Sequence, residues 1–307
     1  MKLIKPKFWE TKNLISLLLY PLSVITYFIN LSKKLHSKKK FAIKTICVGN
    51  IFLGGTGKTS LSIEIEKLLN KKFKTTFIKK NYENQIDEIK LLKKRGEVIS
   101  NEKREYALIY AKKKKFQLAI LDDGLQQKNI DYDIRVVCFN AEKGLGNQFL
   151  LPAGPLRESI NEIKKYDILF LNGEKKNNEL LTKLKTVNKN LKIFQGKYKP
   201  TNLKNFNRNM SYLMFCGIGN PHEFEKTLLK YKFKIKHKII YPDHYKISNN
   251  EIIQLKEIAK NKGLNIITTE KDFSRLRKTE RKNIKFLKVE LKIKDIINFK
   301  KALLDKL

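Results

Sequence analysis

A glycine-rich segment between an apolar strand and a helix constrains this chain more than any other feature. Residues 44–60 read KTICVGNIFLGGTGKTS, with apolar residues on both sides of the glycines. Gly54, Gly55 and Gly57 allow the backbone to curl until its N–H groups converge on an anion, and a helix that begins near Lys58 points its positive end at the same place. The segment therefore predicts a phosphate-binding loop.

The residues of this loop have distinct expected roles. Lys58 would reach the outer phosphates of a nucleotide, and the Thr59 hydroxyl would bind Mg²⁺. Phe52 stands where the usual eight-residue pattern has its first glycine, so the strict pattern is not met. The flanking strand and helix still favour a phosphate-binding loop over a turn that only joins two elements. We expect nucleotide contacts from Phe52, Leu53, Gly54, Gly55, Thr56, Gly57, Lys58 and Thr59.

A second apolar run, further along the chain, ends in paired carboxylates. Residues 116–121 read FQLAIL and lead into Asp122, Asp123 and Gly124. The carboxyl ends of parallel strands share one edge of a sheet, so these carboxylates would lie beside the loop and hold Mg²⁺ directly or through water. The alternative is a plain strand-to-turn junction.

Three other segments carry polar residues suited to chemistry. Arg157 and Glu158 follow a rigid Gly-Pro turn, where a guanidinium suits a phosphate and a carboxylate can orient a neighbour. A helix entry with a surface ion pair is the alternative for that pair. His244 lies in the polar run YPDHY, where the adjacent carboxylate could hold one tautomer, and TEKD at 269–272 follows an apolar strand. A solvated loop explains these last two segments equally well.

Strand-like and helix-like runs alternate along most of the chain. They predict an α/β fold with a mainly parallel sheet flanked by helices, of the P-loop NTPase type. A stretch richer in Lys and Asn separates this core, residues 41–204, from a smaller α/β domain, residues 205–307. The expected strands after the loop are 75–78, 97–99, 117–121, 134–139, 168–171, 192–196, 212–215, 235–240, 265–268 and 284–289, and the expected helices are 86–94, 102–113, 160–165, 223–230, 250–260 and 295–306.

The N-terminal part, residues 1–40, holds the one membrane-like segment. Residues 14–31 are uncharged, but the run is short for a spanning helix, contains Pro21 and is followed by five lysines. We expect a helix that lies in or dips into the cytoplasmic leaflet, with the lysines on anionic headgroups. A buried helix of a soluble core is the alternative. No small-residue cleavage site follows, which argues against a signal peptide.

The charge of the chain is strongly positive. Sixty-six Lys and Arg against 30 Asp and Glu give a formal charge of +36, which suggests an anionic membrane surface or nucleic acid as partner. The lysines are spread along the whole chain and no nucleic-acid motif accompanies them, so we expect no nucleic-acid partner. Three isolated cysteines, Cys47, Cys138 and Cys216, indicate core residues in a reducing compartment.

Taken together, six ordered motifs resemble the tetraacyldisaccharide 4'-kinase (lipid A 4'-kinase) family over nearly the whole chain. They are VGN…GGTGKT at 48–59, DDGLQ at 122–126, GPLRE at 154–158, CGIGNP at 216–221, PDHY at 242–245 and TEKD at 269–272. The family's loop also lacks the first glycine of the usual pattern, which accounts for Phe52.

The resemblance implies an enzyme that uses ATP and Mg²⁺. It would transfer the γ-phosphate to the 4'-hydroxyl of a tetraacylated glucosamine disaccharide 1-phosphate, as a peripheral or monotopic protein at the cytoplasmic face of the bacterial inner membrane. It also implies that Asp87, in Ile86-Asp87-Glu88, activates the acceptor hydroxyl together with His244, and that Lys58 acts in catalysis.

Two segments depart from the family pattern. Residues 79–82 read KKNY where the family has Ser-Arg-Gly-Tyr, and Gln127 replaces a histidine. A different class of protein, a membrane-associated ATPase switch or assembly protein of the ParA or metallochaperone type, has a similar loop. Leu53 stands where those loops carry a signature lysine, which counts against that class.

Overall fold

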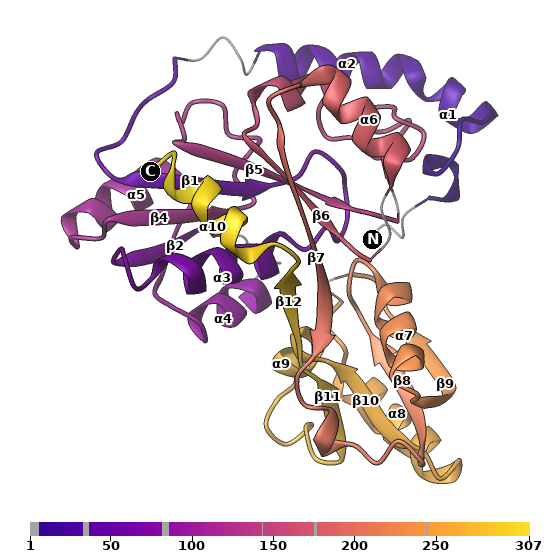
Figure 1. The fold of residues 1–307 in the computed structure, drawn as a ribbon. Coiled ribbons are helices and arrows are strands. Elements are labelled where there is room, and N and C mark those ends of the chain that lie inside the picture. Colours follow the sequence, from indigo (N-terminus) through magenta and orange to yellow (C-terminus); the bar gives the residue numbers. More distant parts are fainter. Residues whose placement is uncertain (1–5, 33–36, 82–85, 143, 175–176, 244) are drawn as a thin grey trace. The chain divides into compact units, whose positions relative to one another are not determined.

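The computed structural model describes residues 6–32, 37–81, 86–142, 144–174, 177–243 and 245–307, with the side chains of Ile86 and Asp87 outside this description (Figure 1). The chain forms two compact units that are each discontinuous in sequence. The larger unit contains residues 5–82, 92–197 and 291–307, and the smaller contains residues 1–4, 83–91 and 198–290.

The larger unit is built on an eight-stranded sheet in the order β12-β7-β6-β5-β1-β4-β2-β3. The six strand pairs from β7 across to β3 are all parallel. The central strand β1 is buried from its second residue to its last, as expected for a parallel strand covered on both faces. The strands are β1 Lys44–Gly49, β2 Thr75–Lys80, β3 Val98–Asn101, β4 Leu118–Asp122, β5 Ile134–Asn140, β6 Ile168–Asn172, β7 Lys192–Pro200 and β12 Val289–Ile293.

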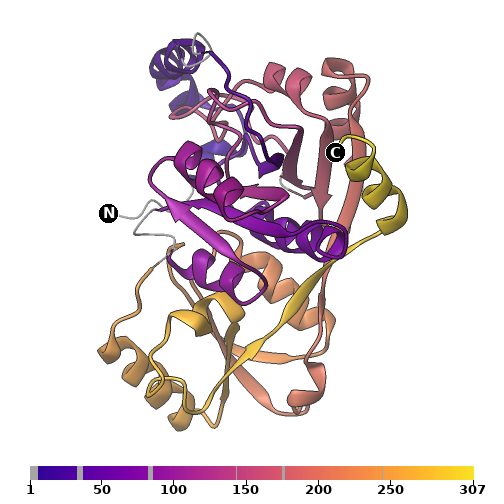
Figure 2. The same ribbon diagram turned by 90° about the vertical axis from the view of Figure 1, so that its left-hand side faces the viewer.

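Helices cover this sheet. α3 packs against β1, β2 and β4, and α5 packs against β2 and β3. The C-terminal helix α10, yellow in Figure 2, lies against the sheet through Phe299, whose ring contacts Phe170 of β6 and Phe194 of β7. After the N-terminal segment, the helical segments described in this unit are α3 Lys58–Leu69, α5 Arg104–Lys113, η4 Ile160–Lys165, α6 Asn178–Val187 and α10 Ile296–Leu304, while α4 Ile86–Lys93 has residues in both units.

The smaller unit is a four-stranded parallel sheet in the order β11-β10-β8-β9. Alternate residues of its central strand β8 enter two different cores. Tyr212, Met214 and Cys216 pack beneath α7, whereas Leu213 and Phe215 pack beneath α8. The elements are η5 Leu203–Asn205, β8 Ser211–Cys216, α7 Pro221–Lys230, β9 Lys234–Ile240, α8 Asn249–Asn261, β10 Asn265–Thr269, α9 Glu270–Arg275 and β11 Ile284–Leu287.

Several expectations differ from this structure. The expected single strand 284–289 is two strands, because the chain leaves the small sheet after Leu287 and enters the large one at Val289. Residues 291–307 therefore pack in the larger unit, although a boundary near 205 assigns them to the smaller domain. Residues 160–165 form a 3₁₀ helix, and α6 and α9 have no counterpart among the expected helices.

Most large apolar side chains of the N-terminal segment point outward. The segment forms η1 Lys7–Trp9, α1 Leu14–Leu18 and α2 Tyr20–Ser32. Trp9 is buried, but from Leu14 to Leu31 every large apolar residue except the half-buried Leu19 is exposed. The contacts to the rest of the larger unit include two hydrogen bonds, from Ser23 Oγ to Leu150 O at 2.8 Å and from Asn30 Nδ2 to Arg157 O at 2.8 Å, and a ring contact between Tyr20 and Phe149. The alternative of a buried core helix is therefore wrong. Within the described part of the chain, no helix combines the length and apolarity needed to cross a bilayer.

Candidate active site

The glycine-rich loop joins β1 to α3 as the sequence predicts. Gly57 has φ +83° and directly precedes Lys58, the first residue of α3, while Gly54 has φ +128°, so both occupy backbone conformations that favour glycine. Gly57 is the N-cap of α3 and has no side chain with which to cap it, and a helix N-terminus of this kind suits an anionic ligand.

Asn50, the first residue of the loop, organises its backbone. Its Nδ2 donates to Phe52 O at 2.6 Å and to Thr56 Oγ1 at 3.0 Å. Its Oδ1 accepts from Arg157 Nη1 at 3.1 Å. Phe52 is itself buried in the core and forms a bridge with Leu156, so the side chain that replaces the usual glycine anchors the loop to the GPLRE segment.

Asp123 gathers two cations beside the loop. Its Oδ1 lies 3.1 Å from Arg157 Nη1 and 3.7 Å from Lys58 Nζ. Burial raises the pKa of this carboxyl, but Lys58, Arg157 and Lys79 outweigh burial and lower the pKa to about 2. Arg157 therefore belongs to the loop cluster and does not form a mere surface ion pair.

Asp122 lies behind the loop with no exposed surface. Its Oδ2 accepts from Thr59 Oγ1 at 3.0 Å and from Lys79 Nζ at 2.7 Å, and its Oδ1 accepts from Ser62 Oγ at 3.3 Å. The carboxylate thus fixes the hydroxyl of Thr59, the residue expected to bind Mg²⁺.

Glu158, a further expected nucleotide contact, is held inside the larger unit. Its Oε1 lies 2.6 Å from Lys128 Nζ, and its Oε2 accepts from Tyr166 OH at 3.1 Å. Only 2% of the residue is exposed. The described contacts of Glu158 therefore stabilise the segment that carries Arg157.

The predicted residues of the smaller unit form a separate cluster. Asp272 is buried and accepts from Gly217 N at 3.1 Å, Thr269 Oγ1 at 2.7 Å and Arg275 Nη1 at 2.8 Å. Burial raises the pKa of this carboxyl despite the nearby Arg275. The described ion pairs of Lys271, in the same motif, are with other carboxylates.

Lys271 forms ion pairs with two carboxylates. Its Nζ lies 3.5 Å from Asp243 and 3.6 Å from Glu88. These carboxylates are next in sequence to His244 and Asp87, respectively. His244 and the Asp87 side chain themselves lie outside the described residues.

Comparison with known proteins establishes the family. A model of the tetraacyldisaccharide-1-P 4'-kinase family matches residues 15–94 and 80–307. The chain is 45% identical to the tetraacyldisaccharide 4'-kinase of Pelagibacter ubique, over 99% of this chain and 98% of that relative. The chain belongs to the tetraacyldisaccharide 4'-kinase family. It is thus a kinase of lipid A biosynthesis, and the alternative of an ATPase switch is set aside.

A second relative and a solved structure of the 4'-kinase family also match this chain. The protein of Rickettsia akari is 33% identical, over 98% of each chain. The crystal structure of LpxK from Aquifex aeolicus in complex with ATP matches 95% of this chain and 99% of that chain with a TM-score of 0.73 at 22% identity, which shows a shared fold. The expected α/β architecture with mainly parallel sheets is confirmed.

Three residues of this candidate site receive no role in the sequence analysis. Asn50 and Lys79 are polar residues at strand ends that become site residues only once the strands are placed side by side. Arg104 donates to Asp123 O at 2.7 Å and to Gln127 Oε1 at 3.2 Å, so Gln127, which replaces the family's histidine, has a defined partner. Arg104 starts an ordinary surface helix, and nothing in its sequence context marks it.

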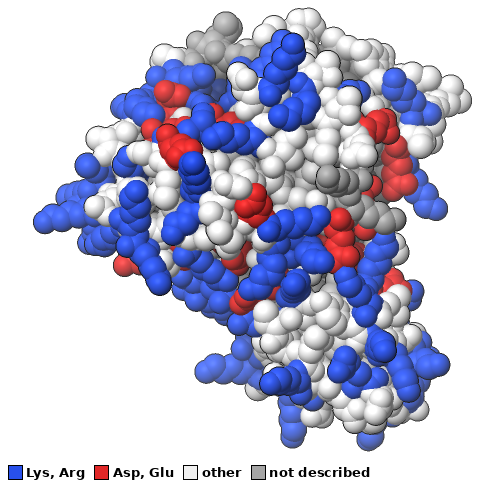
Figure 3. All heavy atoms as spheres, in the orientation of Figure 1, with Lys and Arg blue, Asp and Glu red and all other residues white. Residues whose placement is uncertain are grey.

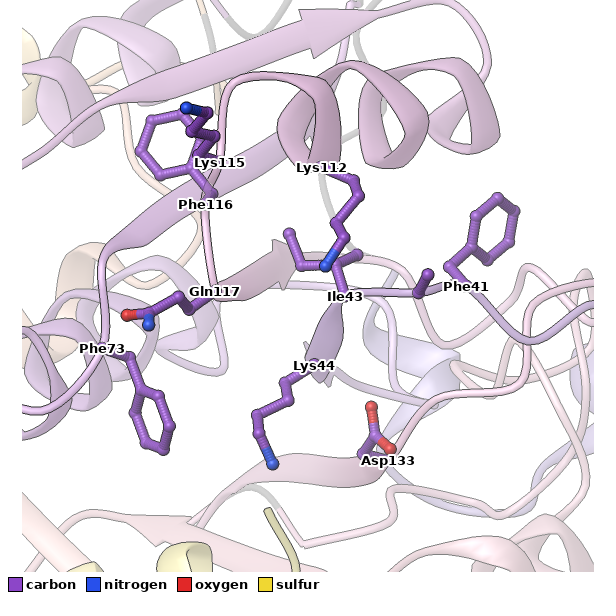
Figure 4. Close-up of a pocket in the computed structure, with 10 residues that line it drawn as sticks. Phe41, Ile43, Lys44, Phe73, Lys112, Lys115, Phe116, Gln117 and Asp133 are labelled. Carbon is purple, nitrogen blue, oxygen red and sulfur yellow. The ribbon is translucent and has the colours of Figure 1, made fainter.

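A cavity of about 540 Å³ lies at the amino ends of the strands of the large sheet, opposite the end that carries the loop (Figure 4). Its lining includes Phe41, Lys44, Phe73, Phe116 and Asp133. Lys44 is the first residue of β1, whereas the loop follows the last, so this cavity is not part of the kinase site. Figure 3 shows Lys and Arg over much of the visible face, in several groups with Asp, Glu and other residues between them.

Proposed function

We propose that this 4'-kinase transfers the γ-phosphate of ATP to the 4'-hydroxyl of a tetraacylated glucosamine disaccharide 1-phosphate at the cytoplasmic face of the inner membrane. The observation that carries the proposal is the cluster of Lys58, Asp123 and Arg157 beside the loop, in a chain that matches the family over nearly its whole length.

Two cations that lie beside the same carboxylate would bind the phosphates of ATP, the phosphoryl donor. Lys58 and Arg157 share Asp123, so both would turn from that carboxylate to the β- and γ-phosphates of ATP. Phosphoryl transfer asks for little covalent work from the protein, and catalysis comes mainly from positioning and from charge on the transferring group. Asn50 fixes the loop and Arg157 relative to each other.

The residues at the loop also fit Mg²⁺. The described residues include no group of three or more His, Cys, Asp or Glu that could cage a metal. Mg²⁺ in kinases is commonly held by one or two protein groups together with substrate phosphates, and it neutralises charge on them. Thr59 and Asp123 would hold the ion, with Asp122 orienting the Thr59 hydroxyl.

Asp87 and His244 are proposed for the acceptor half. Asp87 would accept the proton of the 4'-hydroxyl, and His244 would orient it or tune its basicity. Lys271 binds the neighbour of each, Glu88 and Asp243, which supports a common site for the two segments within the smaller unit.

The substitution Asp87→Ala tests this assignment in a phosphate-transfer assay. It should lower kcat about 100-fold or more while the Kd for ATP stays within a few-fold, because a general base acts only on the acceptor. Asp131→Asn, at a half-exposed ion pair with Arg135, is the matched carboxylate control. Near-normal turnover of Asp87→Ala would remove Asp87 from the mechanism.

The exposed apolar face of α1 and α2 supports attachment to the membrane. Ile25 and Phe28 are 57% and 60% exposed, and an apolar face of this kind binds the boundary between headgroups and acyl chains. The double variant Ile25→Ser/Phe28→Ser should cosediment less with vesicles containing anionic lipid. Ile253→Ser, at an exposed apolar position of α8, is the control. Unchanged cosedimentation of the double variant would contradict this mode of attachment.

A further inference from the structure

A lysine is enclosed within the donor site. Lys79 of β2 is 1% exposed, and its Nζ lies 2.7 Å from Asp122 Oδ2. In the sheet, Ile78 is paired with Leu121, so the residues that follow them, Lys79 and Asp122, lie side by side at the carboxyl edge. An ammonium group taken out of water loses its hydration, and a nearby carboxylate can compensate for that loss. The Asp122 carboxylate is such a partner for Lys79.

The charge of Lys79 lies close to the expected metal position. Lys79 Nζ and Thr59 Oγ1 both donate to the same atom, Asp122 Oδ2. Ser62 donates to the other oxygen of this carboxylate. The described donors therefore engage both oxygens of Asp122. The described ion pairs of Asp123, by contrast, fall on Oδ1 alone.

We propose that Lys79 is a built-in cation of the donor site, which neutralises Asp122, holds it on Thr59 and weakens the binding of a divalent metal. Asp122 is then a positioning residue for Thr59, and Asp123 is the carboxylate that remains for the metal. This role rests on the proposed function, because it concerns the metal that accompanies the nucleotide. A lysine that only stabilised the sheet edge would affect folding and leave metal affinity unchanged.

The test is a titration of Mn²⁺ into the full chain with saturating ADP, with free Mn²⁺ followed by electron paramagnetic resonance. Lys79→Met removes a repulsive charge and unmasks a carboxylate, so the Kd for Mn²⁺ should fall roughly tenfold or more. Lys79→Arg keeps the charge and should stay within about threefold of the original protein. Lys74→Met, an exposed lysine just before the other end of β2, makes the same change in net charge and should leave the Kd unchanged.

A second measurement covers the chance that Lys79→Met folds poorly. Asp122→Asn alone removes the carboxylate charge that faces Lys79 and keeps the lysine charge, so it should weaken Mn²⁺ binding, and adding Lys79→Met to that background should restore it. A Kd for Mn²⁺ that is the same in Lys79→Met and Lys74→Met, or the same in Asp122→Asn with and without Lys79→Met, would overturn the inference. Failure of the unaltered chain to bind ADP and Mn²⁺ at all would overturn the proposed function itself.

Discussion

Each unit of the molecule has an aspartate at the carboxyl edge of its sheet, Asp123 half-buried and Asp272 buried, and the two carboxyls have opposite electrostatic environments. Asp123 in the larger unit is surrounded by Lys58, Arg157 and Lys79, and these cations lower its pKa to about 2 against the effect of burial. Asp272 in the smaller unit forms an ion pair with Arg275, but burial outweighs Arg275 and Lys271 and raises its pKa.

The difference separates a ligand site from a structural turn. The partners of Asp123 are flexible cationic side chains that a nucleotide can attract away from it. The partners of Asp272 include Gly217 N and the Thr269 hydroxyl, which hold the ends of β8 and β10 together. Both aspartates belong to motifs of the family, yet the geometry indicates chemistry at Asp123 and folding at Asp272.

The largest expected effect is the difference in kcat/KM between variants of these two aspartates. Asp123→Asn should lower kcat/KM for phosphate transfer about 100-fold or more, because it removes a charged group from the transition-state site. Asp272→Asn should lower it less than about tenfold, because an amide can still accept the turn hydrogen bonds. Steady-state kinetics at saturating lipid measures both. Equal losses would erase the distinction.

A smaller effect is expected for the residue that organises the loop. Asn50→Ala should raise the Kd for ATP about tenfold, because the loop loses its hydrogen bonds to Phe52 O and Thr56. Asn177→Ala removes another hydrogen-bonded asparagine, one that caps α6 away from the loop, and is the control. Fluorescent-nucleotide titration gives both Kd values. A Kd that shifts equally in both variants would mean that loss of general stability is the cause.

The smallest effects are those of pH on stability, and they should have opposite signs. The folded pKa of Asp123 lies below its unfolded value, so its contribution, about 2 kcal/mol, is present above pH 4 and is lost as the pH falls toward 2. The folded pKa of Asp272 lies above its unfolded value of about 3.9, so its contribution is fullest below that pH and decreases as the pH rises.

Denaturant unfolding between pH 3 and pH 6 checks these signs. The stability difference between the original chain and Asp123→Asn should shrink as the pH falls. The difference for Asp272→Asn should shrink as the pH rises. Parallel trends would show that the two carboxyls do not differ in the way described.

The sequence predicts the strands and the loop well because those signals are local. Apolar runs, glycines and terminal carboxylates identify β1, β4 and the loop without any knowledge of packing. The return of the chain from the smaller sheet to the larger one has no such local signal. Val289 comes just after β11 in sequence, yet it begins a strand of the other sheet. Lys79 escapes for the same reason, because its role depends on which strand lies beside β2. The roles of Asp87 and His244 remain predictions.

The central claim is that the cluster of Lys58, Asp123 and Arg157 serves phosphate transfer to a lipid. The most direct measurement incubates the detergent-solubilised chain with γ-labelled ATP, Mg²⁺ and the tetraacylated disaccharide 1-phosphate, followed by phosphorus and proton NMR of the product. The account predicts one new phosphomonoester, at the 4' position, and its loss in Asp123→Asn. ATP hydrolysis without label in the lipid, or label at another hydroxyl, would contradict it.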